Sequence, residues 1–100
     1  MMRMFSMTFD DFLAIVAIGK SKESARVYGV HLLAWRGFCD EGGLNPLAPT
    51  PNGIADFLAT IPNAQTRASV KSMLTTAFTA LAIHTRDNAD IERLSAIKAI

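Results

Sequence analysis

The chain has 100 residues, of which half are hydrophobic and 19% are charged, with a formal net charge of +1. This length favours one small domain over two, and a hydrophobic sequence of low net charge excludes intrinsic disorder, which requires the opposite balance. The single cysteine excludes a disulfide within the chain.

Met1–Met7 is a methionine-rich lead that we expect to pack loosely, and a first helix follows it. Thr8 is the predicted N-cap, Asp10 and Asp11 stand in the first turn where the helix dipole favours anions, and Gly19 ends the helix. The predicted buried face is Phe9, Phe12, Leu13 and Val16. The apolar run of this helix is too short to span a bilayer, and the two acids before it argue against a signal peptide. We therefore expect a soluble, cytoplasmic protein.

Ser21–Cys39 has the apolar spacing of one long helix, which Ser21 can cap and Gly42-Gly43 can stop. Its buried stripe is predicted to be Ala25, Tyr28, Leu32, Trp35 and Cys39. The position of Cys39 on this stripe favours a small buried hydrophobe over a reactive thiol. Gly29 costs about 1 kcal/mol relative to alanine inside a helix, so we expect a packing reason for it, such as a close helix crossing. The opposite face carries Lys22, Glu23, Arg26, Val30, Leu33 and Gly37.

Leu44–Thr50 contains two prolines and is predicted to be a connecting loop. A short third helix follows, with Thr50 as its N-cap and Pro51 at its first position, and Pro62 ends it. Its predicted apolar face is Ile54, Phe57, Leu58 and Ile61.

Asn63 to Thr66 lead into a long fourth helix that reaches about Arg86. Its predicted buried stripe is Val70, Met73, Ala77, Ala80, Leu81 and His84. The predicted outer face is Ala68, Lys71, Thr75, Thr79, Ala82 and Arg86, flanked by Ser72 and Thr76. Threonine is a mediocre helix former, and short hydroxyls beside a lysine suit close approach to phosphates and base edges. The alternative is a solvated face whose hydroxyls bond their own backbone.

Asn88 is the predicted cap of a fifth helix, whose apolar residues recur at intervals of three: Ile91, Leu94, Ile97 and Ile100. The chain then stops without a C-cap, which we interpret as the end of a fragment. Because no strand-like alternation appears, the predicted fold is all-α, a compact bundle of four to five helices.

The charge is unevenly distributed along the chain. Residues 20–36 and 66–86 together hold seven basic residues and one acidic residue, a local balance of +6, whereas the remainder sums to −5. A basic patch on one face is typical of a protein that binds a polyanion. Two separate solvated faces are the alternative.

No catalytic or metal-binding constellation can be assembled from the sequence. His31 and His84 lie on different predicted helices, and the single cysteine and unclustered carboxylates match no metal-site spacing. Asp10 and Asp11 diverge on their helix and already have a capping explanation. No glycine-rich phosphate loop follows a strand, so no nucleotide or other cofactor is expected.

Several segments together resemble the core-binding domain of tyrosine recombinases and phage integrases. The resemblance begins in the second helix with Ser21, Ser24, Arg26, Tyr28, Leu32, Trp35, Phe38 and Cys39. It continues through Pro49-Thr50-Pro51 and Ile54–Leu58 and ends with Val70–Met73 and His84. About residues 8–100 are covered, in the order and spacing of the family.

The resemblance implies a SAM-like helical domain that forms half of a C-shaped clamp around double-stranded DNA, with the second and fourth helices in the major groove. The implied partners are duplex DNA and other recombinase subunits, with no membrane and no small-molecule substrate. Residues 1–100 would form a single DNA-binding domain without enzymatic activity, and the catalytic domain, with its tyrosine nucleophile, would follow residue 100.

The candidate DNA-binding residues combine this resemblance with the charge distribution. They are Lys20, Lys22, Arg26, Val27, Val30, Arg67, Lys71, Ser72, Thr75, Thr76, Thr79 and Arg86. Val30 is apolar and would offer at best a contact to a thymine methyl group. Ala77 and Ala80 replace larger core residues of the family, so Phe78 and Leu81 are expected to refill the volume. Ala89 stands where many relatives have proline.

A second hypothesis from another class is a helical protein–protein interaction module without DNA binding. It would use the exposed apolar residues Val30 and Leu33, or the Ile91–Ile100 stripe. A small helical enzyme is a more distant third.

Overall fold

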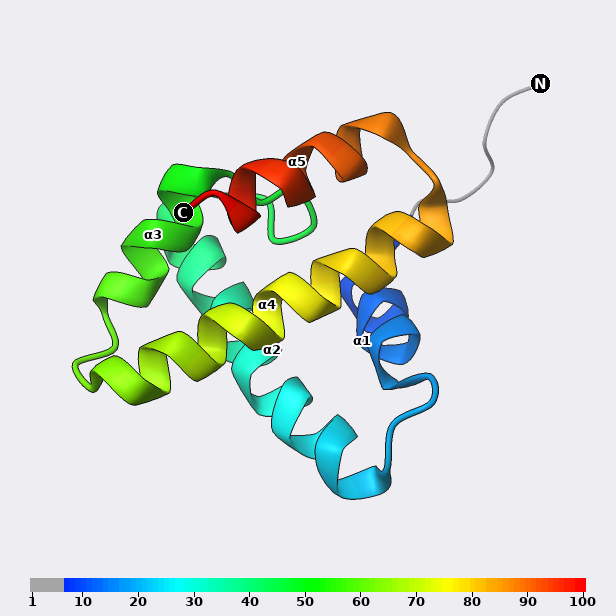
Figure 1. The fold of residues 1–100 in the computed structure, drawn as a ribbon, viewed down its shortest axis with the longest axis horizontal. Coiled ribbons are helices and arrows are strands. Elements are labelled where there is room, and N and C mark those ends of the chain that lie inside the picture. The colour runs from blue at the N-terminus through cyan, green and yellow to red at the C-terminus, as the bar shows by residue number, and fades with distance from the viewer. Residues whose placement is uncertain (1–6) are drawn as a thin grey trace.

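In the computed structural model, which describes residues 7–100, every regular element is a helix (Figure 1). The five helices are α1 (Phe9–Ala17), α2 (Lys22–Gly42), α3 (Pro51–Ala59), α4 (Ala64–Thr85) and α5 (Asn88–Lys98). The all-helical prediction is confirmed for this part of the chain. The predicted lead lies outside the described residues except for Met7, which packs against the core.

The helix starts follow the capping residues of the sequence. Thr8 and Asp11 form a reciprocal capping box, in which the Thr8 amide donates to Asp11 Oδ2 at 3.0 Å and the Asp11 amide donates to Thr8 Oγ1 at 3.1 Å. Ser21, Thr50 and Asn63 cap α2, α3 and α4 in the simpler way, each by accepting one backbone N–H.

One helix start differs from the prediction, and one predicted helix end is confirmed. Asp87, not Asn88, caps α5, because Asp87 is the residue with extended backbone and its carboxylate accepts the Ala89 amide at 2.8 Å. Helix α2 ends at Gly42, where the Gly42-Gly43 stop was predicted, and Gly43 caps it with a left-handed φ of 70°, a conformation that favours glycine.

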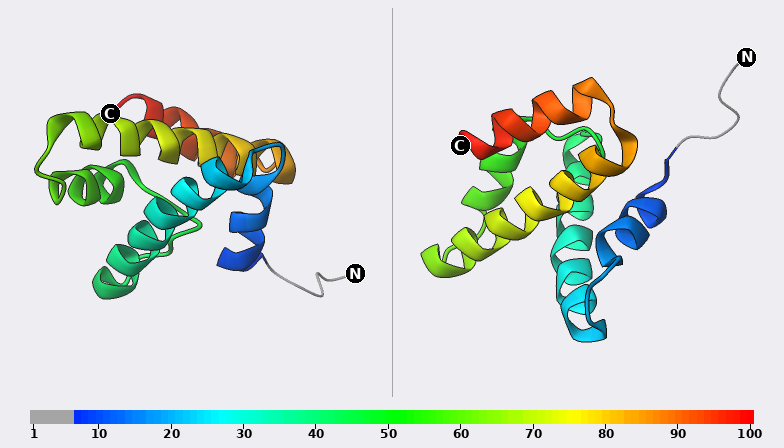
Figure 2. Two further views of the ribbon diagram at one scale, coloured as in Figure 1. Left: turned by 90° about the horizontal axis from the view of Figure 1, so that it is seen from below. Right: turned by 45° about the vertical axis from the view of Figure 1, so that its right-hand side comes forward.

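The two long helices cross, and the shorter helices pack around the crossing. In the view of Figure 1, α4 passes in front of α2, while α5 folds back antiparallel beside α4. Helix α1 packs against α2 and α4 at one side, and α3 packs against α2, α4 and α5 at the other. Figure 2 shows from two further directions that α2 projects away from the layer formed by α4 and α5.

Aromatic residues join the helices in the core. Phe12 of α1 stacks on Phe78 of α4 with ring centroids 5.0 Å apart, and Trp35 of α2 meets Phe57 of α3 edge-on at 5.5 Å. Phe78 and Leu81 are both 3% exposed and lie in the core. Cys39 is fully buried, as predicted.

The buried stripe of α4 was predicted only in part. Val70, Ala77 and Leu81 are buried as expected, whereas Met73 and Ala80 are half-buried and His84 is exposed. Their places in the core are taken by Leu74, Phe78 and Ala82. The reason is that α4 packs against four other helices, α1, α2, α3 and α5. Contact with α5 buries residues on that side of α4, such as Ala82, which the predicted stripe left out.

Other predicted core positions are less buried than expected. Gly29 has no heavy atom within 4 Å of where a Cβ would stand, so the predicted close helix crossing at this glycine is wrong. Several predicted core residues are only half-buried, namely Leu13, Ala25, Tyr28, Ile61 and Leu94. In α5 only Ile97 is fully buried. Ile91 is 48% exposed, and Ile100, which lies just beyond the helix, is 41% exposed.

Candidate nucleic-acid interface

The face of α4 that was predicted to be open is partly covered by α5, while Ala68, Ser72, Thr76 and Arg86 are exposed as predicted. Ala82, expected to point outward, is only 4% exposed, and Lys71, Thr75 and Thr79 are half-buried. Thr79 and Ala82 form one wall of a groove whose other wall includes Leu94 of α5. The prediction of an exposed position is therefore wrong for Ala82. Lys71, Thr75 and Thr79 keep only part of their side-chain surface exposed.

The two half-buried threonines bond to their own helix. Thr75 Oγ1 donates to the Lys71 carbonyl at 2.9 Å, and Thr79 Oγ1 donates to the Thr75 carbonyl at 2.7 Å. This is the back-bonding that hydroxyl residues adopt inside helices. Their hydroxyl hydrogens are thus engaged within α4, as the alternative interpretation of this face expects.

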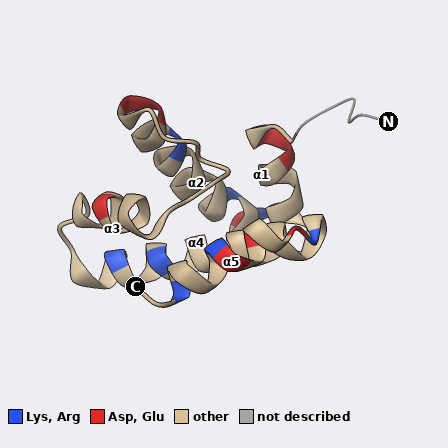
Figure 3. Ribbon diagram, turned by 90° about the horizontal axis from the view of Figure 1, so that it is seen from above, with Lys and Arg blue, Asp and Glu red and all other residues tan. Residues whose placement is uncertain are grey.

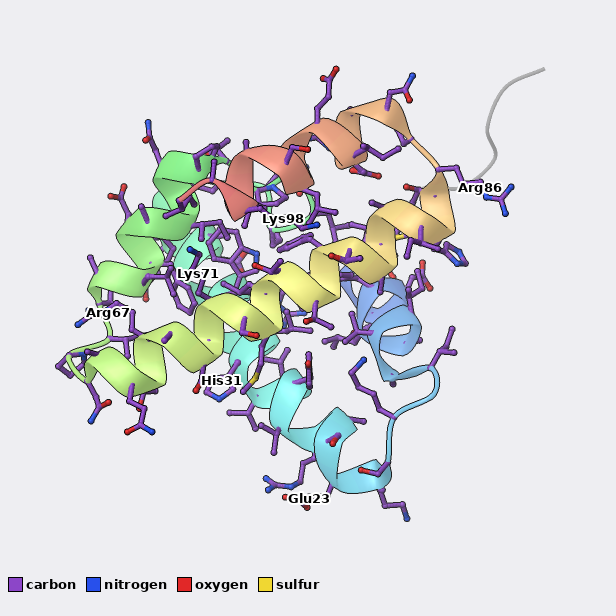
Figure 4. All side chains as sticks on the ribbon, viewed as in Figure 1. Glu23, His31, Arg67, Lys71, Arg86 and Lys98 are labelled. Carbon is purple, nitrogen blue, oxygen red and sulfur yellow. The ribbon has the colours of Figure 1, made fainter. Side chains whose placement is uncertain are left out.

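Two basic side chains of α4 are engaged by the backbone of neighbouring segments. Lys71 Nζ donates to the backbone oxygen of Ile100 at 2.6 Å, and Arg67 Nε donates to the Ile61 carbonyl at 3.0 Å. The guanidinium of Arg67 also reaches the Pro62 carbonyl at 3.2 Å. Figure 4 shows Lys71 on the side of α4 that faces α3 and α5. The Arg67 side chain therefore links α4 to the connection between α3 and α4, and the Lys71 side chain links α4 to the residue at the end of the α5 segment.

The exposed face of α4 is formed by a neighbouring set of residues. Its uncharged polar members are Gln65, Ser69, Ser72 and Thr76, which we call the hydroxyl face. Ser72 and Thr76 belong to the predicted site, whereas Gln65 and Ser69 were missed. An apolar stripe of Val70, Leu74, Ala77 and Leu81 has equally good helical spacing, and it would have placed these residues opposite the core.

No acidic residue occurs along the 22 residues of α4. A phosphate backbone approaching the hydroxyl face would therefore meet no carboxylate on this helix. In the view of Figure 1, nothing lies in front of α4, and the N-terminal half of α2 emerges beyond the crossing without being covered. Exposed candidate residues occur on both helices, Ser72 and Thr76 on α4 and Lys22 and Arg26 on α2.

On α2, Lys22, Arg26 and Val30 are exposed, Val30 by 54%, and Val27 is half-buried. Arg26 forms an ion pair with Glu23, with 2.6 Å between Nη2 and Oε2. This hydrogen bond raises the already high pKa of the guanidinium. Both side chains are more than 60% exposed, and such pairs are weak enough to be exchanged for a phosphate.

Other basic residues counted in the predicted patch have structural roles. Lys20 Nζ donates to the Val16 carbonyl at 2.8 Å, so it satisfies a free backbone group at the end of α1, and it lies 4.7 Å from the ring centroid of Tyr28. Arg36 packs over the Phe9 ring at 5.4 Å. The local excess of positive charge is therefore partly used to hold the helices together.

Arg86 ends α4 in a left-handed conformation with φ of 54° and is exposed. Figure 4 shows it at the end of the molecule opposite Arg67. It lies at an apolar groove of about 360 Å³ between α4 and α5, which is lined by Thr79, Ala82, Ile83, Arg86, Ile91 and Leu94. Arg86 is therefore far from the other candidate residues at the start of α4.

Positive and negative charges are mixed on two of the helices. Figure 3 shows Lys and Arg segments on α4, both signs on α2 and α5, and Asp or Glu segments on α1 and α3. Lys22 and Arg26 lie near the start of α2, and Ser72 and Thr76 lie in the middle of α4. The described structure does not gather all seven basic residues of the two segments on one surface.

Cys39 and the histidines add no reactive centre to this surface. Burial, reinforced by the nearby charge of Asp40, raises the pKa of the Cys39 thiol to about 11, so it stays protonated at neutral pH. Across residues 7–100, no three His, Cys, Asp or Glu side chains are grouped as metal ligands would be. Over the same range, none of the helices combines the length and the apolar character that crossing a membrane requires.

Comparisons of this chain with protein-family models, with curated proteins and with solved structures found no match.

Proposed function

We propose that this chain is a duplex-DNA-binding domain of the core-binding, SAM-like kind found in tyrosine recombinases and integrases. The observation that carries the proposal is the 22-residue, acid-free helix α4, which crosses α2 and leaves its hydroxyl face open. Short hydroxyl and amide side chains can approach phosphates and base edges closely, and an acid-free helix does not repel them. The sequence resemblance and the five-helix architecture support the same function.

The proposed contact surface differs from the one expected from the sequence. It comprises Ser69, Ser72 and Thr76 of α4 together with Lys22, Arg26 and Val30 of α2. Lys22 and Arg26 would contact phosphates, Val30 would meet a thymine methyl group, and the hydroxyl face would position the helix in the groove. Lys20, Arg67 and Arg86 are assigned to structural or peripheral positions.

With this role the chain would bind and orient DNA and leave strand cleavage to a separate catalytic domain. Its partners would be duplex DNA and further recombinase subunits bound to the same site. The small number of free cations on the surface predicts weak binding, in the range of non-specific complexes, roughly 10⁻⁴–10⁻⁶ M at physiological salt.

The test is fluorescence anisotropy with a labelled DNA duplex, repeated between about 50 and 200 mM salt. We expect binding whose affinity falls steeply with salt, because phosphate contacts release counterions. Absence of binding at the lower salt concentration, or an affinity independent of salt, would reject the function.

A protein–protein interaction module is the second candidate, and the exposed aliphatic residues of α2 favour it. Val30 and Leu33 are 54% and 47% exposed on adjacent positions of the helix surface, and apolar side chains in such a place suit a partner helix. This function predicts self-association that does not depend on salt. Sedimentation velocity over a range of protein concentrations, with Leu33→Asp as the disrupting variant, separates it from DNA binding.

A further inference from the structure

Helix α5 covers the side of α4 that carries Lys71, Thr75 and Thr79. The groove between the two helices has Thr79 and Ala82 in one wall and Ile91 and Leu94 in the other. At the opposite end of the contact, Lys71 Nζ donates to the backbone oxygen of Ile100 at 2.6 Å. The α5 segment therefore supplies the acceptor that engages the Lys71 amine, and a phosphate would have to replace that acceptor.

Helix α5 packs on α4 and α3, but only one of its side chains is fully buried. Ile97 is fully buried, whereas Ile91 is 48% exposed, and the open groove of about 360 Å³ shows that the two helices are not packed along their whole length. A helix of 11 residues is too short to be stable by itself, so it depends on what it packs against. Ile97 is thus the main apolar anchor of α5.

The polar attachments lie at the two ends of the segment and are replaceable. Thr85 Oγ1 donates to Asp90 Oδ2 at 2.7 Å at the start of α5, and the Lys71 bond holds the other end. Water can take over either partner at small net cost. For Lys71, a phosphate oxygen is a charged acceptor and can replace the Ile100 oxygen.

We propose that α5 is a detachable cover that withholds Lys71 from DNA until it is displaced, an inference that rests on the proposed DNA-binding function. Lys71 would contact DNA only in molecules from which α5 is displaced. The contribution of Lys71 to the apparent affinity for DNA is therefore smaller when a larger fraction of molecules has α5 docked. The acidic residues of this segment, Asp87, Asp90 and Glu92, lie at its start, away from the end that Lys71 contacts. Displacement of α5 would therefore act on Lys71 by releasing its amine from the Ile100 oxygen.

Lysine acylation tests the cover without DNA. The intact chain is treated with an amine-acetylating reagent, and modification of Lys71 is measured by peptide mass spectrometry relative to exposed Lys22. Ile97→Ala removes the anchor, and Leu32→Ala is the matched control, because Leu32 is equally buried but lies in α2, which within residues 7–100 shares no contact with α5. We expect the Lys71-to-Lys22 ratio to rise about tenfold in I97A and to stay near the wild-type value in L32A. An unchanged ratio in I97A, or an equal rise in both variants, would overturn the proposal.

DNA binding tests the consequence. Lys71→Gln is measured by anisotropy in the wild-type chain and in I97A, where the lysine is expected to be uncovered. We expect I97A to bind more tightly than wild type, and K71Q to weaken binding less than about twofold in wild type but about three- to tenfold in I97A. An equal loss in both backgrounds overturns the cover while leaving the DNA-binding function intact. No binding by either background, even with raised Lys71 acylation, rejects the DNA-binding function and the role of α5 with it.

Discussion

The indole N–H of Trp35 donates to the backbone oxygen of Pro46 at 3.0 Å, and this bond joins the middle of α2 to the proline-containing loop before α3. The ring itself is 1% exposed and contacts Phe57 of α3 edge-on. Trp35 thus sets both the path of the loop and the position of the next helix.

Replacing Trp35 by phenylalanine should lower the free energy of unfolding by about 2–4 kcal/mol, because it leaves a cavity and removes the donor of a part-buried bond. Urea unfolding followed by circular dichroism measures this change, since Trp35 is the only tryptophan and fluorescence would be lost with it. Phe38→Leu, beside the same ring but half-buried, is the control and should cost less. Equal losses would mean that the Pro46 bond contributes nothing.

Two glycine-to-alanine substitutions should have opposite effects on stability. Gly29 lies inside α2 with no heavy atom within 4 Å of the position that a Cβ would take, so Gly29→Ala should stabilise the protein by about 0.5–1 kcal/mol through helix propensity. At Gly53 the added Cβ would stand 3.0 Å from Thr50 Oγ1, the oxygen that caps α3, so Gly53→Ala should destabilise it. Melting temperatures of the two variants compare the effects directly, and a stabilising Gly53→Ala would contradict the tight packing around this cap.

An added negative charge on the hydroxyl face should weaken DNA binding. Ser72→Glu places a carboxylate in the middle of the exposed side of α4, and we expect the affinity for duplex DNA to fall about tenfold at low salt, because a favourable phosphate approach becomes repulsive. Ser95→Glu adds the same charge at an exposed position of α5, outside the proposed surface, and is the matched control. If both variants lose affinity equally, the effect reflects net charge and the proposed surface is wrong.

Cys39 should make the stability depend on pH in the alkaline range. Its pKa is about 11 in the folded protein against an ordinary value of 9.0, so folding favours the protonated thiol. The contribution of this thiol is complete below pH 9 and is lost as the pH rises toward 11. The stability advantage of wild type over Cys39→Ala, measured by urea unfolding at several pH values, should therefore shrink across this interval. A constant difference would contradict the raised pKa.

Local sequence rules predicted the elements well because the forces behind them act within a few residues. Thr8, Ser21 and Thr50 were recognised as caps, since a side-chain oxygen placed before an apolar run can satisfy free backbone N–H groups wherever the helix lies in the fold. The one cap that was misplaced, Asn88 instead of Asp87, lies where two adjacent residues can both perform this role.

The candidate site was predicted less well, and Lys71 and Thr76 show why. Both lie on α4, and its mixed small, apolar and hydroxyl residues permit more than one buried stripe at helical spacing. The sequence by itself determined that residues 7–100 are all-helical with Thr8, Ser21 and Thr50 as caps, that Trp35 and Cys39 lie inside, and that α4 carries no acid. Only the tertiary structure decided that α5 packs on the Lys71 side and leaves Thr76 open, because that choice depends on how the flanks of α4 are divided between α1, α2, α3 and α5.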